Sequence, residues 1–121
     1  ARELAGLGFT LHATCGTATA LCEHGIKVHP VFKISEGRPN VIDYINGREM
    51  QWIINTPSTG ATPRVDEIRM RAHAVIKGVP ITTTVSGFRA AIEGLKALRD
   101  MGRMEVCSIQ EYHRQSLHLD V

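Results

Sequence analysis

The chain has 121 residues, the length of one domain with room for a hydrophobic core. It is 43% hydrophobic and 21% charged, as in an ordinary globular protein, and its net charge of +2 is too small to favour a nucleic-acid partner. No apolar run reaches the ~18 residues that a membrane span needs, so no membrane partner is expected. The cysteines, Cys15, Cys22 and Cys107, have no paired spacing, which favours reduced thiols in a cytoplasmic protein.

Along the chain, a helical stretch, a glycine and an apolar β-rich run recur in that order. Helices are expected at 1–7, 17–24, 40–46, 64–77, 86–100 and near 109–114. The glycines are Gly8, Gly25, Gly47, Gly78 and Gly102, and the runs after them are FTLHAT, IKVHPV, QWIINT, ITTT and MEVCSI. Glycine after a helix suits the left-handed C-cap conformation. Helices that alternate with short β-branched strands predict an α/β fold: a three-layer, doubly wound, Rossmann-like domain with a mainly parallel sheet.

Ala1–Leu7 has the sequence of a helix end, whereas a fold of this kind normally opens with a strand. We therefore expect residues 1–121 to form a single domain that lacks its first strand and part of its first helix. The residues after His113, 114–121, are expected to be a loose tail. Ser86 is the expected N-cap of the helix 86–100.

Phe9–Thr19, FTLHATCGTAT, reads as a short strand that leads through a polar turn directly into a helix. The first turn of a helix has unpaired N–H groups and the positive end of the helix dipole, which suit an anion. Thr14 and Thr17 would add hydroxyl donors, and Gly16 would allow close approach of the backbone. This stretch predicts an anion site.

Parallel strands bring their carboxyl ends to one edge of the sheet, where ligands bind. The polar residues expected there are Thr14, Thr17, Lys33, Asn55, Thr56, Ser58 and Thr82–Thr84. Hydroxyls, an amide and one ammonium suit a phosphate joined to a sugar or a polar ring, and no convergent carboxylate or histidine indicates catalysis. Plainer interpretations stay open: the threonines as ordinary strand residues, Asn55–Ser58 as a turn and Lys33 as a solvated lysine. The histidines have no metal-ligand spacing, and His12 is expected to pack beside its strand.

Several motifs together resemble a known family. They are HATCGTA, FKISEGRPNVIDYINGRE, WIINTPS, ITTTVSGFRAAIEGL and VCSIQEYH. They are similar to the C-terminal regulatory domain of the carbamoyl-phosphate synthetase large subunit, which belongs to the methylglyoxal-synthase-like group. The resemblance runs from about Ala1 to His113, and the EGRPN loop, the INTPS turn and the SIQEYH ending are its specific parts.

The resemblance implies an allosteric domain without chemistry of its own, which binds the inhibitor UMP and the activator IMP. Thr14, Thr17 and Lys33 match the residues that hold the phosphate in relatives. Asn55 and Thr56 match residues that line the rest of the nucleotide site, and Val41 matches an apolar wall for the base. Thr83 resembles a residue that contacts ornithine, at the junction with the synthetase body, in some relatives. A further phosphate-binding lysine of the family would fall before Ala1.

The same resemblance implies the wider setting. The expected partners are the remainder of the large subunit and the glutaminase small subunit. The domain itself would need no cofactor, while the parent enzyme uses ATP and magnesium elsewhere to make carbamoyl phosphate for pyrimidine and arginine synthesis. The family member that is controlled by N-acetylglutamate lacks the GT and EGRPN patterns, so their presence favours nucleotide control.

Two enzymes are the alternatives. Methylglyoxal synthase places a catalytic aspartate in a Gly-Gly-Asp sequence where this chain has Gly37-Arg38-Pro39. Proline can neither accept nor donate a proton, which argues against that reaction. An inosinate cyclohydrolase domain would share the fold, but the SIQEYH ending and the INTPS turn argue against it.

Overall fold

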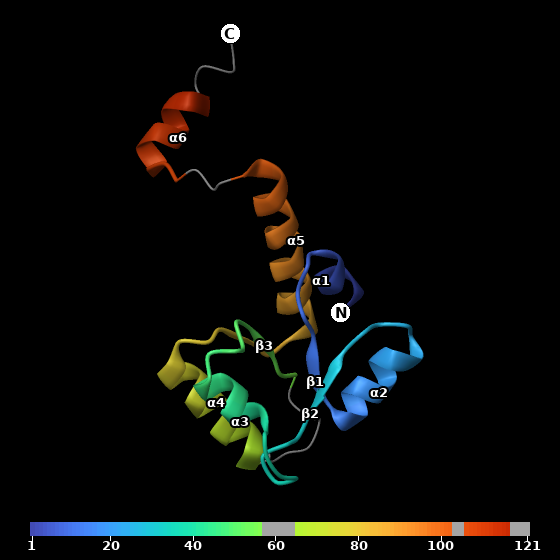
Figure 1. Ribbon diagram of the computed structural model, residues 1–121. Coiled ribbons are helices and arrows are strands. Elements are labelled where there is room, and N and C mark those ends of the chain that lie inside the picture. Colours follow the sequence, from blue (N-terminus) through green and yellow to red (C-terminus); the bar gives the residue numbers. More distant parts are fainter. Residues whose placement is uncertain (57–64, 103–105, 117–121) are drawn as a thin grey trace.

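The computed structural model describes residues 1–56, 65–102 and 106–116. Helices alternate with short strands, as the sequence predicts, and the body of the molecule is an α/β domain (Figure 1). In chain order the elements are α1 (Arg2–Gly6), β1 (His12–Thr14), α2 (Cys15–Glu23), β2 (His29–Val31), α3 (Val41–Asn46), β3 (Ile53–Ile54), α4 (Val65–Lys77), β4 (Ile81–Thr82), α5 (Val85–Met101) and α6 (Ile109–Ser116).

The strands pair in two parallel couples. β1 pairs with β2, in a register that places His12 beside His29 and Thr14 beside Val31. β3 pairs with β4, with Ile53 beside Ile81. Parallel pairing was predicted and is confirmed, and each pair is joined through a helix, α2 or α4, as a parallel connection requires.

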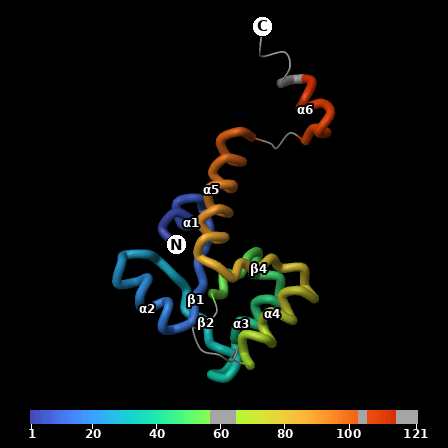
Figure 2. The backbone as a smooth tube through the Cα atoms, turned by 180° about the vertical axis from the view of Figure 1, so that it is seen from behind, coloured from blue at the N-terminus to red at the C-terminus, as the bar shows by residue number. Residues whose placement is uncertain are grey.

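The expected single sheet is present as two two-stranded sheets in the described residues. They lie side by side in the front and back views, with β3 next to β1 (Figures 1 and 2). No ladder of hydrogen bonds joins β1 to β3 among the described residues, so each of these strands has one partner strand.

Four of the five glycine stops are confirmed. Gly8, Gly25, Gly78 and Gly102 all have φ between 69° and 91°, the left-handed region that glycine enters without strain. At Gly47 the prediction is wrong, because φ is −72° there and the next residue, Arg48, takes the positive φ of 58°.

Side chains start two of the helices. Asn40 caps α3 in a capping box: its Oδ1 accepts from the Ile42 N–H at 3.0 Å, and its own N–H donates to Asp43 at 2.8 Å. Thr84, rather than the expected Ser86, caps α5 by accepting from the Gly87 N–H at 3.0 Å. Ser86 lies inside the first turn, because the helix begins at Val85, one residue earlier than predicted.

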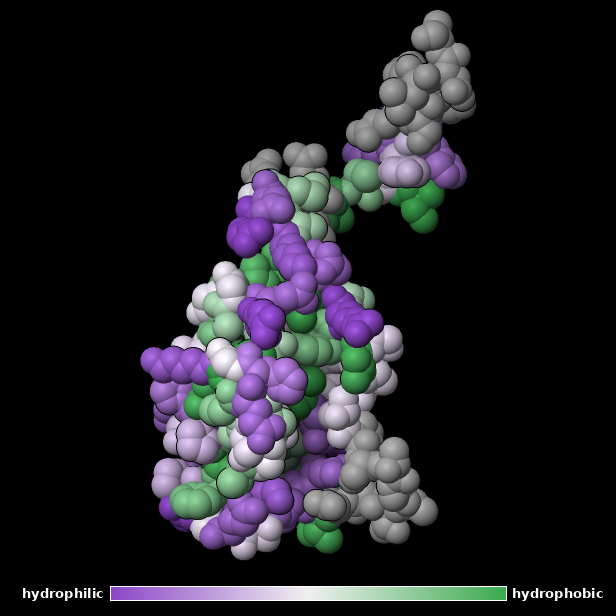
Figure 3. Space-filling view, turned by 90° about the vertical axis from the view of Figure 1, so that its right-hand side faces the viewer, coloured by the Kyte–Doolittle hydropathy of each residue, from purple (hydrophilic) through white to green (hydrophobic). Residues whose placement is uncertain are grey.

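The core lies between α3, α4 and the β3–β4 pair. Its buried residues are Ile45, Ile53 and Ala74, and half-buried apolar side chains pack around them: Val41, Met50, Met70, Val79 and Ile81. Many apolar residues stay exposed, including Val75 and Ile76 on α4 and Met101 on α5. The face in Figure 3 accordingly mixes hydrophilic and apolar side chains.

α5 projects from the body, and α6 lies apart from it in both views (Figures 1 and 2). Lys96 on α5 bonds Glu3 at 2.7 Å, which ties α5 to α1. The strand expected at 104–109 is not seen in its described part, 106–108, and residues 103–105 lie outside the description. α6 begins at Ile109 because Ser108 and Glu111 exchange capping hydrogen bonds. The loose tail expected at 114–121 is wrong for residues 114–116, which belong to α6, and residues 117–121 lie outside the description. None of the helices in the described residues is long and apolar enough to span a membrane.

Candidate functional site

The turn from β1 into α2 is the segment for which the sequence predicts an anion site. Thr14 is the last residue of β1 and the N-cap of α2, with extended backbone at φ −67° and ψ 155°. Its side chain caps no N–H group of the helix, so its hydroxyl is left for another partner. Thr17 is exposed in the first turn and lines an open hollow together with Arg2 and His24.

Lys33 follows β2 by two residues, so it lies at the same end of the parallel pair as Thr14. Its Nζ is 3.3 Å from Oε1 of Glu36, and its backbone N–H donates to Oε2 of the same carboxylate at 3.0 Å. The bond from this N–H and the nearby Lys33 charge lower the pKa of Glu36. The Glu36 carboxylate therefore stays ionised at neutral pH and pairs with the Lys33 ammonium, the cation of the candidate site.

The loop after Lys33 is tied down at both ends. The Ser35 N–H donates to Oδ2 of Asp66 on α4 at 3.1 Å. At the other end, Asn40 donates to the Gly37 carbonyl at 2.9 Å, and Arg38 lies 3.5 Å from Asp43. Two carboxylates, Glu36 and Asp66, thus border the loop.

Asn55 follows β3 directly. Its backbone N–H donates to the Thr82 carbonyl at 2.9 Å, which extends the β3–β4 pair by one bond. Its side-chain oxygen, turned toward Arg71 of α4, accepts from Nη2 at 3.1 Å and from Nε at 3.3 Å. Thr56 is exposed, and the residues after it, 57–64, including the expected turn residue Ser58, lie outside the description.

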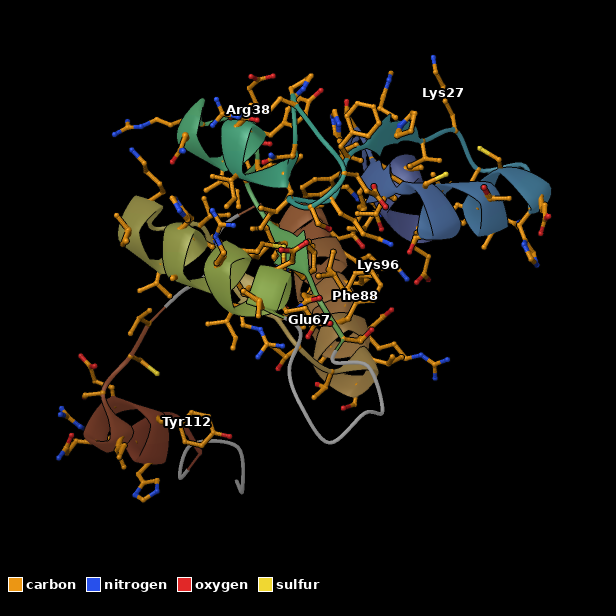
Figure 4. The ribbon with its side chains drawn as sticks, turned by 90° about the horizontal axis from the view of Figure 1, so that it is seen from below. Lys27, Arg38, Glu67, Phe88, Lys96 and Tyr112 are labelled. Atoms are coloured by element: carbon orange, nitrogen blue, oxygen red, sulfur yellow. The ribbon has the colours of Figure 1, made fainter. Side chains whose placement is uncertain are left out.

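The three threonines after Ile81 have different roles. Thr82 accepts a hydrogen bond from the Trp52 indole at 3.0 Å. The Trp52 ring also packs edge-on against Phe88, whose position on α5 is labelled in Figure 4. Thr84 caps α5. Thr83 is exposed, and its hydroxyl has no hydrogen-bond partner among the described residues, which leaves it available to a ligand or another domain.

Val41 is the first residue of α3 and lies half-buried against the core cluster. Its N–H donates to the Phe32 carbonyl at 3.3 Å, next to Lys33. Val41, which by resemblance would form the apolar wall for the nucleotide base, therefore also packs against the core.

The structure gathers the expected residues into two groups. Thr14, Thr17 and Lys33 belong to the β1–β2 pair, whereas Asn55 and Thr83 belong to the β3–β4 pair. Two charged residues were missed by sequence reasoning: Glu36 on Lys33 and Arg71 on Asn55. The spacing of Lys33 and Glu36 could have suggested their pairing, but nothing local links Arg71 to Asn55, which is 16 positions away in the sequence.

His12 packs beside its strand, as expected. Its ring centroid is 5.2 Å from that of His29 on β2 and 5.5 Å from that of Tyr44 on α3. Its Nδ1 is buried without a hydrogen-bond partner among the described residues. Burial lowers the pKa of His12, the charge of His29 lowers it further, and Glu49 acts in the opposite direction. No group of three metal-binding side chains occurs in the described part of the chain.

Parallel strands with helical crossovers, and polar residues where the strands end, define a Rossmann-like α/β domain. The chain belongs to the MGS-like domain family, whose model matches residues 1–83.

Several curated relatives are similar over most of this chain. A carbamoyl phosphate synthase large chain from Rhodopirellula baltica is 46% identical over 116 residues, which is 96% of this chain and 10% of that protein. A "Carbamoyl phosphate synthase large chain, C-terminal section" from Methanopyrus kandleri is 42% identical over 94% of this chain and 21% of the relative. An arginine-specific, chloroplastic large chain from Oryza sativa is 42% identical over 88% of this chain and 9% of its own length. The chain thus spans a small part of the relatives that it matches.

Proposed function

We propose that this chain is the regulatory domain of a carbamoyl phosphate synthase large chain, and that it binds a nucleoside monophosphate, UMP or IMP. The observation that carries the proposal is the β1–α2 turn. There a threonine hydroxyl that caps no N–H group of the helix, and the helix N-terminus itself, lie at the same end of a parallel pair as Lys33. The similarity to a C-terminal section of such a large chain supports the proposal that this domain is part of a large chain.

In this proposal the phosphate lies against the first turn of α2. The hydroxyls of Thr14 and Thr17 and the N–H groups of the first turn donate hydrogen bonds to the phosphate, and Lys33 supplies the opposite charge. The dianion replaces Glu36 as the partner of the Lys33 ammonium. Charge-assisted bonds of this kind contribute roughly 1.5–3 kcal/mol each.

The rest of the nucleotide then extends toward the second strand pair. Asn55 and Thr56 line it, and Val41 forms the apolar wall for the base from the start of α3. Thr83, exposed and without a partner in the described residues, is proposed as the contact with ornithine or with the rest of the synthetase.

The wider setting is part of the same proposal. The remainder of the large chain and the glutaminase small chain are the partners, and ATP and magnesium act in the synthetase body. The effectors would control carbamoyl phosphate supply for pyrimidine and arginine synthesis, in the cytoplasm.

We propose that the domain itself is not catalytic. The position that would supply a carboxylate in methylglyoxal synthase is Pro39, which has no ionisable group. Purified protein supplied with dihydroxyacetone phosphate should therefore release neither methylglyoxal nor phosphate. Turnover that depends on the presence of this chain would favour the alternative, a methylglyoxal synthase-type enzyme.

The binding test is calorimetric titration of UMP and IMP into the natural protein that carries this chain. Lys33→Ala should weaken binding by about ten-fold or more, because a loss of ~1.4 kcal/mol is one factor of ten. Thr17→Val keeps the side-chain shape but removes the donor, so it should cost less. Uridine should bind far more weakly than UMP.

Lys27→Ala is the matched control, because Lys27 is exposed and points away from the body (Figure 4). Equal binding to the Lys33→Ala protein and the parent would show that the phosphate site is elsewhere. Failure of both nucleotides to bind the parent at millimolar concentration would refute the nucleotide proposal.

A further inference from the structure

The side-chain amide of Asn55 is held in one orientation by Arg71. A guanidinium carries hydrogen-bond donors only, so the group that faces it must be the amide oxygen. That oxygen lies 3.1 Å from Nη2 and 3.3 Å from Nε, which makes a two-point contact. Glu67, one turn earlier on α4, lies 3.9 Å from the same Nη2, and its side chain is only 17% exposed. The carboxylate thus helps to keep the guanidinium against α4.

This contact decides what Asn55 offers to a ligand. An unrestrained amide can turn either its oxygen or its nitrogen toward a partner, so it does not distinguish donors from acceptors. With the oxygen taken by Arg71, the amide can offer a ligand only the hydrogens of its NH2 group. Asn55 therefore presents donors only.

The position of Asn55 decides which part of the ligand meets these donors. The expected phosphate contacts, Thr14 and Lys33, belong to the β1–β2 pair, whereas Asn55 ends a strand of the neighbouring pair. A nucleoside monophosphate anchored by its phosphate would direct its base toward the second pair. The amide then meets an edge of the base rather than the phosphate.

We infer that Arg71 is a positioning residue which, through Asn55, selects nucleotides with an exocyclic oxygen on the base over those with an exocyclic amino group. This inference rests on the proposed nucleotide function. The oxygen of uracil or hypoxanthine accepts a hydrogen bond from the Asn55 NH2 group. The amino group of cytosine or adenine is itself a donor, so it cannot accept from the Asn55 NH2 group, and both groups are left unpaired.

The experiment compares the affinities of UMP with CMP, and of IMP with AMP, in the natural protein that carries this chain. In the parent, the oxo nucleotide of each pair should bind about ten-fold more tightly, the effect of one lost hydrogen bond and one unpaired group. Arg71→Met should reduce this ratio to about two-fold or less, because the amide can then rotate. Arg71→Lys should retain most of the ratio, because an ammonium also carries donors only.

Asn55→Asp provides the opposite change. Its carboxylate accepts but does not donate, so the ratio should invert in favour of CMP and AMP, although the added charge weakens all nucleotides. Arg69→Met is the matched control, since Arg69 is an exposed arginine on the same helix with no contact to Asn55. Titration with inorganic phosphate checks that the anion site is unchanged in each variant.

The outcomes separate the two proposals. If UMP and IMP bind the parent but Arg71→Met weakens all four nucleotides equally, with the ratios unchanged, Arg71 only supports the fold and this inference is wrong. An unchanged ratio in Asn55→Asp would also overturn it. If neither UMP nor IMP binds the parent, it is the nucleotide function that fails.

Discussion

The carboxylate of Glu36 holds Lys33 at two points: its Oε1 is 3.3 Å from Nζ, and its Oε2 accepts from the backbone N–H at 3.0 Å. The lysine proposed to bind phosphate therefore already has an anionic partner from its own loop. A phosphate must displace this carboxylate from the ammonium, so Glu36 competes with the ligand.

Glu36→Gln should raise the affinity for UMP and for inorganic phosphate. Glutamine can still accept from the Lys33 N–H but lacks the charge that competes for the ammonium. The gain should be modest, up to about five-fold, because exposed ion pairs contribute little. Titration of the parent and variant measures it, and Glu23→Gln, an equal charge change at the end of α2, is the control. Unchanged or weaker binding in Glu36→Gln would contradict competition.

The cap of α5 gives a stability prediction. Thr84→Ala removes the hydroxyl that accepts from the Gly87 N–H, and should lower the free energy of unfolding by about 1 kcal/mol. Urea unfolding measures the change. Ser86→Ala should have little effect, since the one hydrogen bond of the Ser86 hydroxyl within the described residues is a long 3.4 Å bond to Thr84. A larger loss in the Ser86 variant would restore Ser86 as the cap.

Ile45 is the largest fully buried side chain in the described residues, with no exposed surface. Ile45→Ala should lower the free energy of unfolding by about 2–5 kcal/mol, because it leaves a cavity between α3 and α4. Ile76→Ala on α4, where the side chain is 76% exposed, should change it by no more than about 0.5 kcal/mol. Equal losses at both positions in urea unfolding would show that α3 does not pack on α4 as described.

His12 should make stability depend on pH. Its pKa in the folded protein is below the ordinary value of 6.5, because its ring is partly buried and lies beside His29. As the pH falls below 6.5, His12 therefore becomes protonated in the unfolded chain before it does so in the folded protein. The stabilising contribution is complete above pH 6.5 and is lost as the pH falls below that value toward the lowered pKa.

The groups that face His12 set the size of this effect: His29 on β2, Tyr44 on α3, and Glu49, whose charge opposes the shift. His12→Phe keeps an aromatic ring without a proton site. In urea unfolding at about pH 5 and about pH 8, the variant should lose less stability on acidification than the parent. His24→Gln, at an exposed histidine, is the control. The same pH dependence in His12→Phe and the parent would exclude His12 as its source.

Much of the local structure follows from the sequence. The glycine stops at Gly8, Gly25, Gly78 and Gly102 were predictable, because few other residues adopt a positive φ without strain. The recurring order of helix, glycine and β-branched run made α4 and α5 predictable, and the same alternation indicated parallel strands. These features depend on residues that are close in the chain, so a local pattern is sufficient to indicate them.

The cap of α5 was misassigned because Thr84 and Ser86 are both capable caps, and only the packing of the preceding strand decides where the helix begins. A similar reason applies to the described part of the strand expected at 104–109: residues 106–108 have no strand to pair with among the described residues. Intrinsic β-propensity is too weak to form a strand without a partner.

The sequence by itself determined the α/β class, the parallel pairing and the positions of Thr14, Lys33 and Asn55 at strand ends. Only the tertiary structure decided what those residues contact: Glu36 lies on Lys33, and Arg71 of α4 lies on Asn55. It also decided that the strands form two pairs instead of one sheet. The physical reason is that backbone preferences act over a few residues, whereas ion pairs, amide orientation and strand neighbours depend on groups that meet only when the chain has folded.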